Sequence, residues 1–213
     1  MGKLITILFL TGIWKGGYSQ DEWTLKSEKE GISVYTRTFP DSKFKAIKVE
    51  LELEASLSRM VAVLLDVNAG ADWIYATKSS VLLKQVSTTE LYYYSEVSLP
   101  WPFSNRDFIA RLKVTQDSGT KVVTVDGPTV ADYLPAKEDI VRVVRSEGKW
   151  VITPMGGGRI RVEYTLRTDP GGDIPAWLFN LFVTKGPMES FANLKEQLKK
   201  PAYAQAHLPF LVE

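Results

Sequence analysis

The stretch "LPWPFSNRDFIARLKVT" (residues 99–115) combines a stiff aromatic loop with an alternating strand. Pro100 and Pro102 lack a backbone N–H and push the residues before them out of the helical region, so the loop cannot pair within a sheet. Farther along, apolar residues alternate with Arg111 and Lys113, which gives a strand one apolar face and one wet face. The apolar members are Phe108, Ala110, Leu112 and Val114. The stretch therefore predicts a sheet strand preceded by a rigid loop that carries two large aromatic residues.

The same alternation recurs on both sides of this stretch. In "KAIKVELELEA" (45–55) isoleucine, valine and leucine face one way, while lysine and glutamate face the other. The later segment "RIRVEYTLR" (159–167) repeats the pattern, with the apolar members Ile160, Val162, Tyr164 and Leu166. Further strands are expected within residues 23–39 (two short strands), 80–86, 91–99, 121–126, 139–145 and 150–153. This succession predicts a long, curved antiparallel sheet with one apolar face.

Helical patterns occur twice in the chain. Ser56 is a suitable N-cap for a helix that Asn68 and Gly70 end. The segment "DPGGDIPAWLFNLFVTKGPMESFANLKEQLKK" (169–200) predicts a long closing helix, which Gly186–Pro187 is expected to kink or break. Its apolar stripe consists of Met188, Phe191, Leu194 and Leu198. Because one sheet face and one long helix must cover each other, the expected class is α+β.

The composition excludes several kinds of chemistry. The 213 residues, of which 45% are hydrophobic, suffice for one domain with a sizeable core. With 26 basic and 25 acidic side chains the net charge is +1, which argues against nucleic-acid binding. The chain has no cysteine, and its one histidine, His207, lies near the end and is expected at the surface. The sequence therefore predicts neither a cofactor nor a metal site.

The first twenty residues, "MGKLITILFLTGIWKGGYSQ", have the layout of a secretory signal peptide. One early lysine precedes an apolar run that is too short to span a membrane comfortably, and cleavage is expected between Ser19 and Gln20. The alternative is a retained helix that packs on the domain of a cytoplasmic protein. We expect export to the periplasm or the medium, with residues 1–19 as the signal peptide, 20–200 as the domain and 201–213 as a tail.

Three motifs together resemble a known family. "PWPFSNRDF" (100–108), "GKWVITP" (148–154) and "DPGGDIPAWLFN" (169–180) are similar to the START domain, the steroidogenic acute regulatory protein-related lipid transfer module. The order of elements agrees from about residue 23 to residue 200, as in a bacterial-type single-domain member. The resemblance implies a helix-grip fold, in which a curved antiparallel sheet wraps a long C-terminal helix around an internal apolar cavity for one lipid. It also places the loop at residues 99–107 beside that helix, at the cavity mouth.

Strand alternation and the implied fold together predict which residues bind the ligand. The expected cavity lining is Tyr93, Ser95, Val97, Phe108, Ala110, Leu112, Val114, Ile160, Val162, Tyr164, Leu166, Trp177, Leu181 and Phe191. If the resemblance holds in detail, Tyr93 and Ser95 supply the few hydrogen-bonding groups of the cavity, although ordinary sheet packing explains such residues equally well. Arg111 and Lys113 are expected on the outer face.

The expected gate loop consists of Trp101, Phe103, Arg106 and Asp107. Its two aromatic residues are expected either to form a hydrophobic rim that touches a membrane or to pack as ordinary core. Arg106 and Asp107 are adjacent, so in a strand they point to opposite faces and cannot form one acid–base site. We expect structural roles, with Asp107 accepting backbone amides of the loop and Arg106 binding carbonyls or another carboxylate.

One departure from the family bears on the ligand. Some cholesterol-binding members have a cavity arginine six residues after the arginine that matches Arg106, and this chain has Leu112 there. The resemblance therefore argues against sterol specificity and favours a drier cavity. We expect a non-enzymatic protein that binds a lipid for transfer or sensing and contacts membranes transiently. The alternatives are a polyketide cyclase or aromatase of the same fold and an interaction module whose cavity is filled.

Overall fold

The computed structural model of this protein describes residues 22–213, with the backbone alone at Ala176, Asn180 and Leu181. The predicted signal peptide, residues 1–19, lies outside the described residues. Between residues 22 and 213 there is no helix with both the length and the apolar character that a membrane crossing requires.

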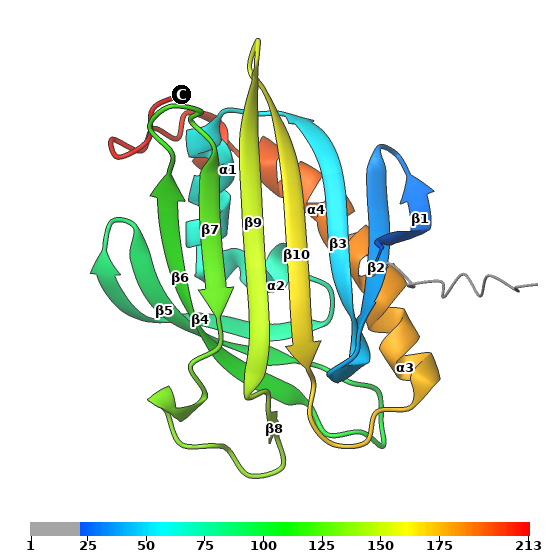
Figure 1. Cartoon of the computed structure of the whole chain (residues 1–213). Coiled ribbons are helices and arrows are strands. Elements are labelled where there is room, and N and C mark those ends of the chain that lie inside the picture. Colours follow the sequence, from blue (N-terminus) through cyan, green and yellow to red (C-terminus); the bar gives the residue numbers. More distant parts are fainter. Residues whose placement is uncertain (1–21) are drawn as a thin grey trace, which may run out of the picture.

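A single curved sheet of ten strands forms the body of the molecule (Figure 1), and this confirms the predicted antiparallel architecture. Its order is β1-β2-β3-β10-β9-β7-β6-β5-β4. The short β8 lies off this path and pairs with β6 in parallel. The strands are β1 (Thr24–Lys29), β2 (Ile32–Phe39), β3 (Ser42–Glu54), β4 (Thr77–Ser87), β5 (Glu90–Val97), β6 (Arg106–Gln116), β7 (Val123–Pro128), β8 (Val141–Arg142), β9 (Arg145–Gly156) and β10 (Arg159–Asp169). Because β3 pairs with β10, the third strand of the chain lies directly beside the last one within the sheet.

The expected strand at 139–145 is wrong in extent. Within this range Val141–Arg142 pairs with β6 and Arg145 begins β9, and residues 129–140 instead form a loop with one 3-10 turn, η2 (Ala131–Tyr133). Pro128 and Pro135 lack the N–H that a ladder needs, which explains why pairing stops here. The expected strand at 150–153 is instead the longer β9.

Helices cover the concave face of the sheet. They are α1 (Leu57–Leu65), the 3-10 turn η1 (Val67–Ala69), α2 (Gly70–Trp73), α3 (Ala176–Asn180), the π-helical turn η3 (Leu181–Lys185), α4 (Gly186–Lys199) and α5 (Pro201–Ala204). Ser56 caps α1 as predicted, since its side chain accepts a hydrogen bond of 3.1 Å from the Arg59 amide. The expected irregularity at Gly186–Pro187 takes the form of the π turn directly before it, because Pro187 offers no N–H to the preceding turn.

The segment predicted to be a tail, residues 201–213, packs on the domain. Leu211 is buried, and the Glu213 carboxylate accepts hydrogen bonds of 2.8 and 2.9 Å from the backbone amides of Leu57 and Ser58 at the start of α1. Those amides have no partner within their own helix, so the carboxylate satisfies them and also complements the helix dipole. His207 is exposed, as expected. One end of the molecule, at the top of Figure 1, is thereby closed by α1, α4 and the chain terminus.

Candidate functional site

A cavity of about 330 Å³ lies between the concave sheet face and the helices. This volume is within the range of small-molecule sites, about 300 to 1,000 Å³. Its walls come from β3, β5, β6, β7, β9 and β10, and from α1, α2, α3, η3 and α4. The predicted lining residues that the structure places there are Tyr93, Val97, Phe108, Leu112, Tyr164, Leu166 and Phe191. Arg111 pairs with Glu90 and Lys113 is exposed, so both lie outside the cavity, as predicted.

Three predicted lining residues belong to the packed core instead. Val114, Ile160 and Val162 point to the concave side, but they lie at the end of the sheet that α1 and α4 cover. They are buried in a cluster with Met60 of α1 and Leu194 of α4. The alternation of the strands is thus right, and the helices leave no space above these positions.

Three other predicted lining residues lie elsewhere, and a fourth has its side chain outside the described residues. Ser95 is buried, and its hydroxyl donates a hydrogen bond of 3.3 Å to the Ser79 carbonyl of the neighbouring strand, so it does not line the cavity. Ala110 is buried opposite the large ring of Tyr93, and its short side chain does not reach the cavity. Trp177 is 54% exposed and lies at the surface. The side chain of Leu181 lies outside the described residues.

The sequence reasoning missed an aromatic group that forms much of the wall. Trp150 lies on β9 with its ring centroid 4.4 Å from Tyr164, 5.4 Å from Phe191 and 6.3 Å from Trp73. The indole nitrogen of Trp73 is buried and has no hydrogen-bond partner among residues 22–213. Strand alternation from Ile152 back to Trp150 could have identified the latter, whereas Trp73 lies in the single turn α2, which is too short for a periodic signal.

Charged groups occur in three places around the cavity. Lys45 and Asp66 border it at exposed positions. Arg106 is buried, and its guanidinium donates to the carbonyls of Ser104, Pro170 and Gly171 at 2.6, 3.4 and 3.1 Å. Burial lowers the pKa of Arg106. The carbonyl contacts agree with the role expected for this arginine, which ties the loop before β6 to the loop before α3.

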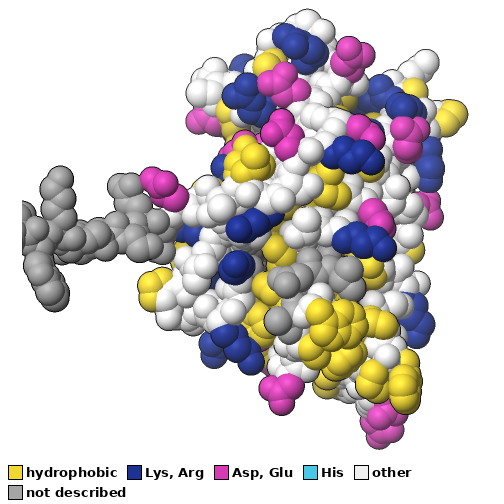
Figure 2. All heavy atoms as spheres, turned by 90° about the vertical axis from the view of Figure 1, so that its right-hand side faces the viewer, with side chains coloured by type: hydrophobic (Ala, Val, Ile, Leu, Met, Phe, Trp, Pro, Cys, Tyr) yellow, Lys and Arg dark blue, Asp and Glu magenta, His cyan; other side chains and the backbone are white. Residues whose placement is uncertain are grey.

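Exposed aromatic residues lie beside this connection. Trp101 is 92% exposed, while Phe103 is partly buried with its ring centroid 6.1 Å from that of Trp177 on α3. Figure 2 shows hydrophobic side chains gathered over the lower part of this face, around α3. Of the two alternatives for the loop aromatics, packing as core is therefore wrong for Trp101. We call Trp101, Phe103 and Trp177 the aromatic rim.

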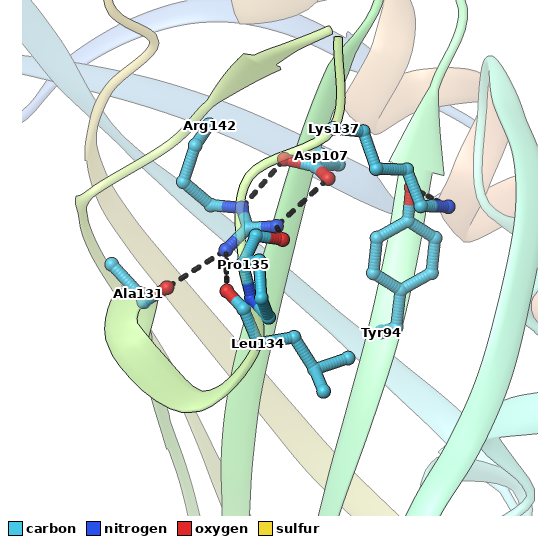
Figure 3. Close-up of polar contacts among 7 residues, drawn as sticks. All are labelled: Tyr94, Asp107, Ala131, Leu134, Pro135, Lys137 and Arg142. Atoms are coloured by element: carbon cyan, nitrogen blue, oxygen red, sulfur yellow. Dashed lines mark hydrogen bonds and ion pairs between the residues drawn. The ribbon is translucent and has the colours of Figure 1, made fainter.

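Asp107 has a different partner from the one expected. Its carboxylate accepts two hydrogen bonds, of 2.7 and 3.1 Å, from the Arg142 guanidinium on the outer face of the sheet (Figure 3), rather than from loop amides. The parallel register sets Asp107 directly beside Arg142, which explains the pairing. The same guanidinium donates to the carbonyls of Ala131, Leu134 and Pro135, and the Asp107 carboxylate raises the pKa of Arg142. This bidentate contact fastens the 129–142 loop to the sheet.

The loop before β6 is also held from the outer side. The Asn105 side chain accepts a hydrogen bond of 3.2 Å from the Leu99 amide and donates one of 2.7 Å to Glu96. Lys78 reaches the same Glu96 carboxylate at 2.8 Å and, with Asn105, lowers the pKa of Glu96 despite partial burial. The loop that carries Trp101 and Phe103 is therefore held by hydrogen bonds on both faces of the sheet.

The geometry of sheet, closing helix and cavity agrees with comparisons to known proteins. The START domain sequence profile matches residues 14–202 of this chain. An uncharacterized protein of Pseudomonas aeruginosa is 31% identical over 191 residues, which cover 87% of this chain and 91% of that protein. The phosphatidylcholine transfer protein of Bos taurus is 30% identical over 181 residues, which cover 83% of each chain. The crystal structure of a STAR-related lipid transfer protein from Xanthomonas axonopodis superposes with a TM-score of 0.77 at 35% identity, covering 84% of this chain and 99% of that one.

Proposed function

This chain belongs to the START domain family, and on that premise we propose that it encloses one lipid or similar hydrophobic molecule and transfers it between membranes. The observation that carries the proposal is the cavity between the sheet and the closing helix, with its apolar and aromatic walls. Removing an alkyl chain from water contributes about 0.8 kcal/mol per methylene, so such walls bind a lipid without specific polar contacts. The names of the bovine and Xanthomonas relatives support lipid transfer as the activity.

The aromatic rim is the proposed site of membrane contact. Large exposed aromatic side chains favour the membrane–water interface, where their apolar rings leave water. Trp101 lies on the loop, Trp177 lies on α3, and the two are linked through Phe103, so separation of the loop from α3 would open the mouth. The π turn that follows α3 gives the closing helix a place to yield.

A lipid-transfer assay between vesicles tests whether the cavity opens between the loop and α3. We expect the wild-type protein to move a fluorescent phosphatidylcholine from donor to acceptor vesicles, and we expect Trp101→Ala/Phe103→Ala to slow that transfer at least fivefold. Equilibrium binding of the same lipid should change less than twofold, because the rim sets the barrier whereas the cavity wall sets the affinity. Tyr133→Ala, an exposed aromatic on the outer loop, is the matched control and should transfer normally. A folded double variant with the wild-type rate would exclude the rim as the gate.

The proposed carrier performs no reaction. Asp66 is the one carboxylate among the described lining residues, and it accepts a hydrogen bond of 2.8 Å from the Tyr203 hydroxyl at an exposed position. A cyclase or aromatase shapes a reactive chain with converging acid and base groups. Incubation of the protein with a linear polyketide thioester should therefore leave the substrate unchanged, and formation of a cyclised product would support the enzyme instead.

Export is the proposed location, on the residue pattern of positions 1–19. N-terminal sequencing of the protein from its native host tests it. A mature chain beginning at Gln20 would support export, whereas an intact Met1 or Gly2 would exclude cleavage.

A further inference from the structure

Two tyrosine hydroxyls inside the cavity have no hydrogen-bond partner in the part of the chain that the structure describes. Tyr93 on β5 and Tyr164 on β10 both line the cavity, and neither hydroxyl makes a hydrogen bond within residues 22–213. Both side chains keep some accessible surface. Both side chains line the cavity, and burial raises the pKa of each hydroxyl. An inward polar group without a partner is costly unless a ligand or water satisfies it.

Two glycines lie between the two tyrosines, and neighbouring side chains pack over them, Leu112 over Gly127 and Tyr164 over Gly148. Gly148 on β9 and Gly127 on β7 are register partners, and both line the cavity. A methyl group added at Gly148 would lie 3.3 Å from the Tyr164 hydroxyl oxygen, so this hydroxyl packs over the backbone at Gly148. Glycine inside a strand marks a place where a ligand or another chain comes close to the backbone.

The curvature of the sheet sets Tyr93 opposite these glycines. The strand order runs from β10 through β9, β7 and β6 to β5, so the two tyrosines flank the paired glycines from either side. Ionisation of Tyr93 would further raise the pKa of Tyr164, which agrees with two hydroxyls that share one space. Each ring is fixed by a neighbour: the ring centroids of Tyr93 and Phe108 lie 5.7 Å apart, and those of Tyr164 and Trp150 lie 4.4 Å apart.

We propose that the hydroxyls of Tyr93 and Tyr164, on either side of the Gly127–Gly148 pair, bind an uncharged oxygen group of the lipid, an ester carbonyl or a hydroxyl. The inference rests on the proposed lipid-binding function and adds the class of the ligand and its orientation. Protonated phenols donate to such an oxygen and can accept from a hydroxyl. Among the described lining residues no cation is available at this position, since Lys45 is exposed and Arg106 is bound to three carbonyls, so a bare phosphate or carboxylate would be buried without compensation.

Three probes share one apolar body and differ only in their oxygen group. They therefore distinguish hydrogen bonding to the two hydroxyls from apolar burial alone. They are decylpyrene, which has no oxygen, pyrene-labelled decanol, and the methyl ester of pyrene-labelled decanoic acid, each titrated by fluorescence against lipid-free full-length protein. We expect Tyr93→Phe and Tyr164→Phe each to weaken binding of an oxygen-bearing probe about fivefold, and the double variant about thirtyfold, as expected for one and two hydrogen bonds. Binding of decylpyrene should be unchanged, because phenylalanine keeps the shape of the wall. Whether the alcohol or the ester loses more identifies the preferred oxygen group.

Tyr92→Phe is the matched control. Tyr92 is the neighbour of Tyr93 on β5, but its ring stacks on Tyr133 at 4.7 Å and does not line the cavity, so this variant should bind all three probes normally. Equal loss of all three probes in the double variant, or loss of none, would overturn the hydroxyl site and leave lipid binding standing. If the wild-type protein binds no probe at all, the lipid-binding function itself is wrong, and the hydroxyl site with it.

Discussion

The inward faces of β6 and β10 pass through two different interiors. At one end Val114 and Ile160 are sealed beneath α1 and α4, whereas at the other Phe108 and Tyr164 border a cavity. The core end and the cavity end are formed by the same face of the same two strands, with the same alternation of side chains. The comparison teaches that alternation decides which side of a sheet a residue faces, while the covering helix decides whether that position is core or cavity.

The two covers differ in regularity. α1 is capped at its start by Ser56 and by the Glu213 carboxylate, and it packs as a continuous helix on the core end. The cavity end is covered by the short α3 and by the π turn η3, which place Phe182 and Val183 against the lining. Beneath them, Gly127 and Gly148 add no side chains of their own to the wall, and Leu112 and Tyr164 pack over them. The irregular helical cover leaves the space that the core end lacks.

Truncating a leucine to alanine should give the largest difference in the free energy of unfolding between the two ends. Leu194→Ala removes a fully buried side chain of α4 and should lower the free energy of unfolding by about 3 kcal/mol, from lost burial and the cavity left behind. Leu166→Ala trims a side chain that already borders empty space and should cost less than about 1 kcal/mol. Urea denaturation of the lipid-free protein measures both variants. Equal losses would mean that the two ends are packed alike.

Replacing a valine by phenylalanine should give a smaller difference in stability between the two ends, and at the cavity end it should also weaken lipid binding. Val162→Phe forces a large ring into the sealed end and should cost about 2 kcal/mol. Val97→Phe adds the same volume at the cavity wall, so we expect nearly unchanged stability and weaker lipid binding. A stable Val162→Phe variant, or a strongly destabilised Val97→Phe variant, would contradict the division.

Raising the pH should give the smallest change in the free energy of unfolding. Burial raises the pKa of Tyr93 and Tyr164 above their unfolded values, so their contribution to stability is complete below about pH 10 and is lost as the pH rises beyond it. Between pH 10 and about pH 10.5 the free energy of unfolding should fall about 1 kcal/mol more in the wild type than in Tyr93→Phe/Tyr164→Phe, because two tyrosines titrate in the wild type.

Tyr203 at the closed end supplies the control for this titration. Burial, together with the hydrogen bond to Asp66, raises the pKa of Tyr203 to about 12. Tyr203→Phe should therefore reduce the alkaline loss as well, but it should also lower stability at neutral pH by about 1 kcal/mol, since it breaks a bond within the protein. The cavity variants break no such bond, and a comparable neutral-pH loss in them would indicate that their hydroxyls do have protein partners.

The sequence predicted the sheet and its apolar face because period-two alternation is local information. It placed Arg111 outside and Leu112 inside correctly. It could not separate Val162 in the core from Tyr164 in the cavity, because these differ only in what α1, α4 and η3 place above them. Such coverage depends on contacts between segments far apart in the chain.

The sequence pattern also does not predict contacts between side chains that lie far apart in the chain. The partner of Asp107 is Arg142, and a two-residue parallel bridge that follows an irregular loop brings them together. No periodic pattern marks so short a strand. The exposure of Trp101 was left open for the same reason, since only the packing of Phe103 against Trp177 decides which ring of the loop points outward.

Native mass spectrometry of the protein purified without denaturation tests the central claim most directly, namely that the open end of the interior holds a lipid. We expect a species heavier than the polypeptide by the mass of one lipid, and solvent extraction should release a molecule with an uncharged oxygen group. The Val97→Phe variant should carry less of it than the wild type. A bare polypeptide mass for the wild type, even after incubation with phosphatidylcholine vesicles, would contradict the account and indicate a cavity that stays empty or closes.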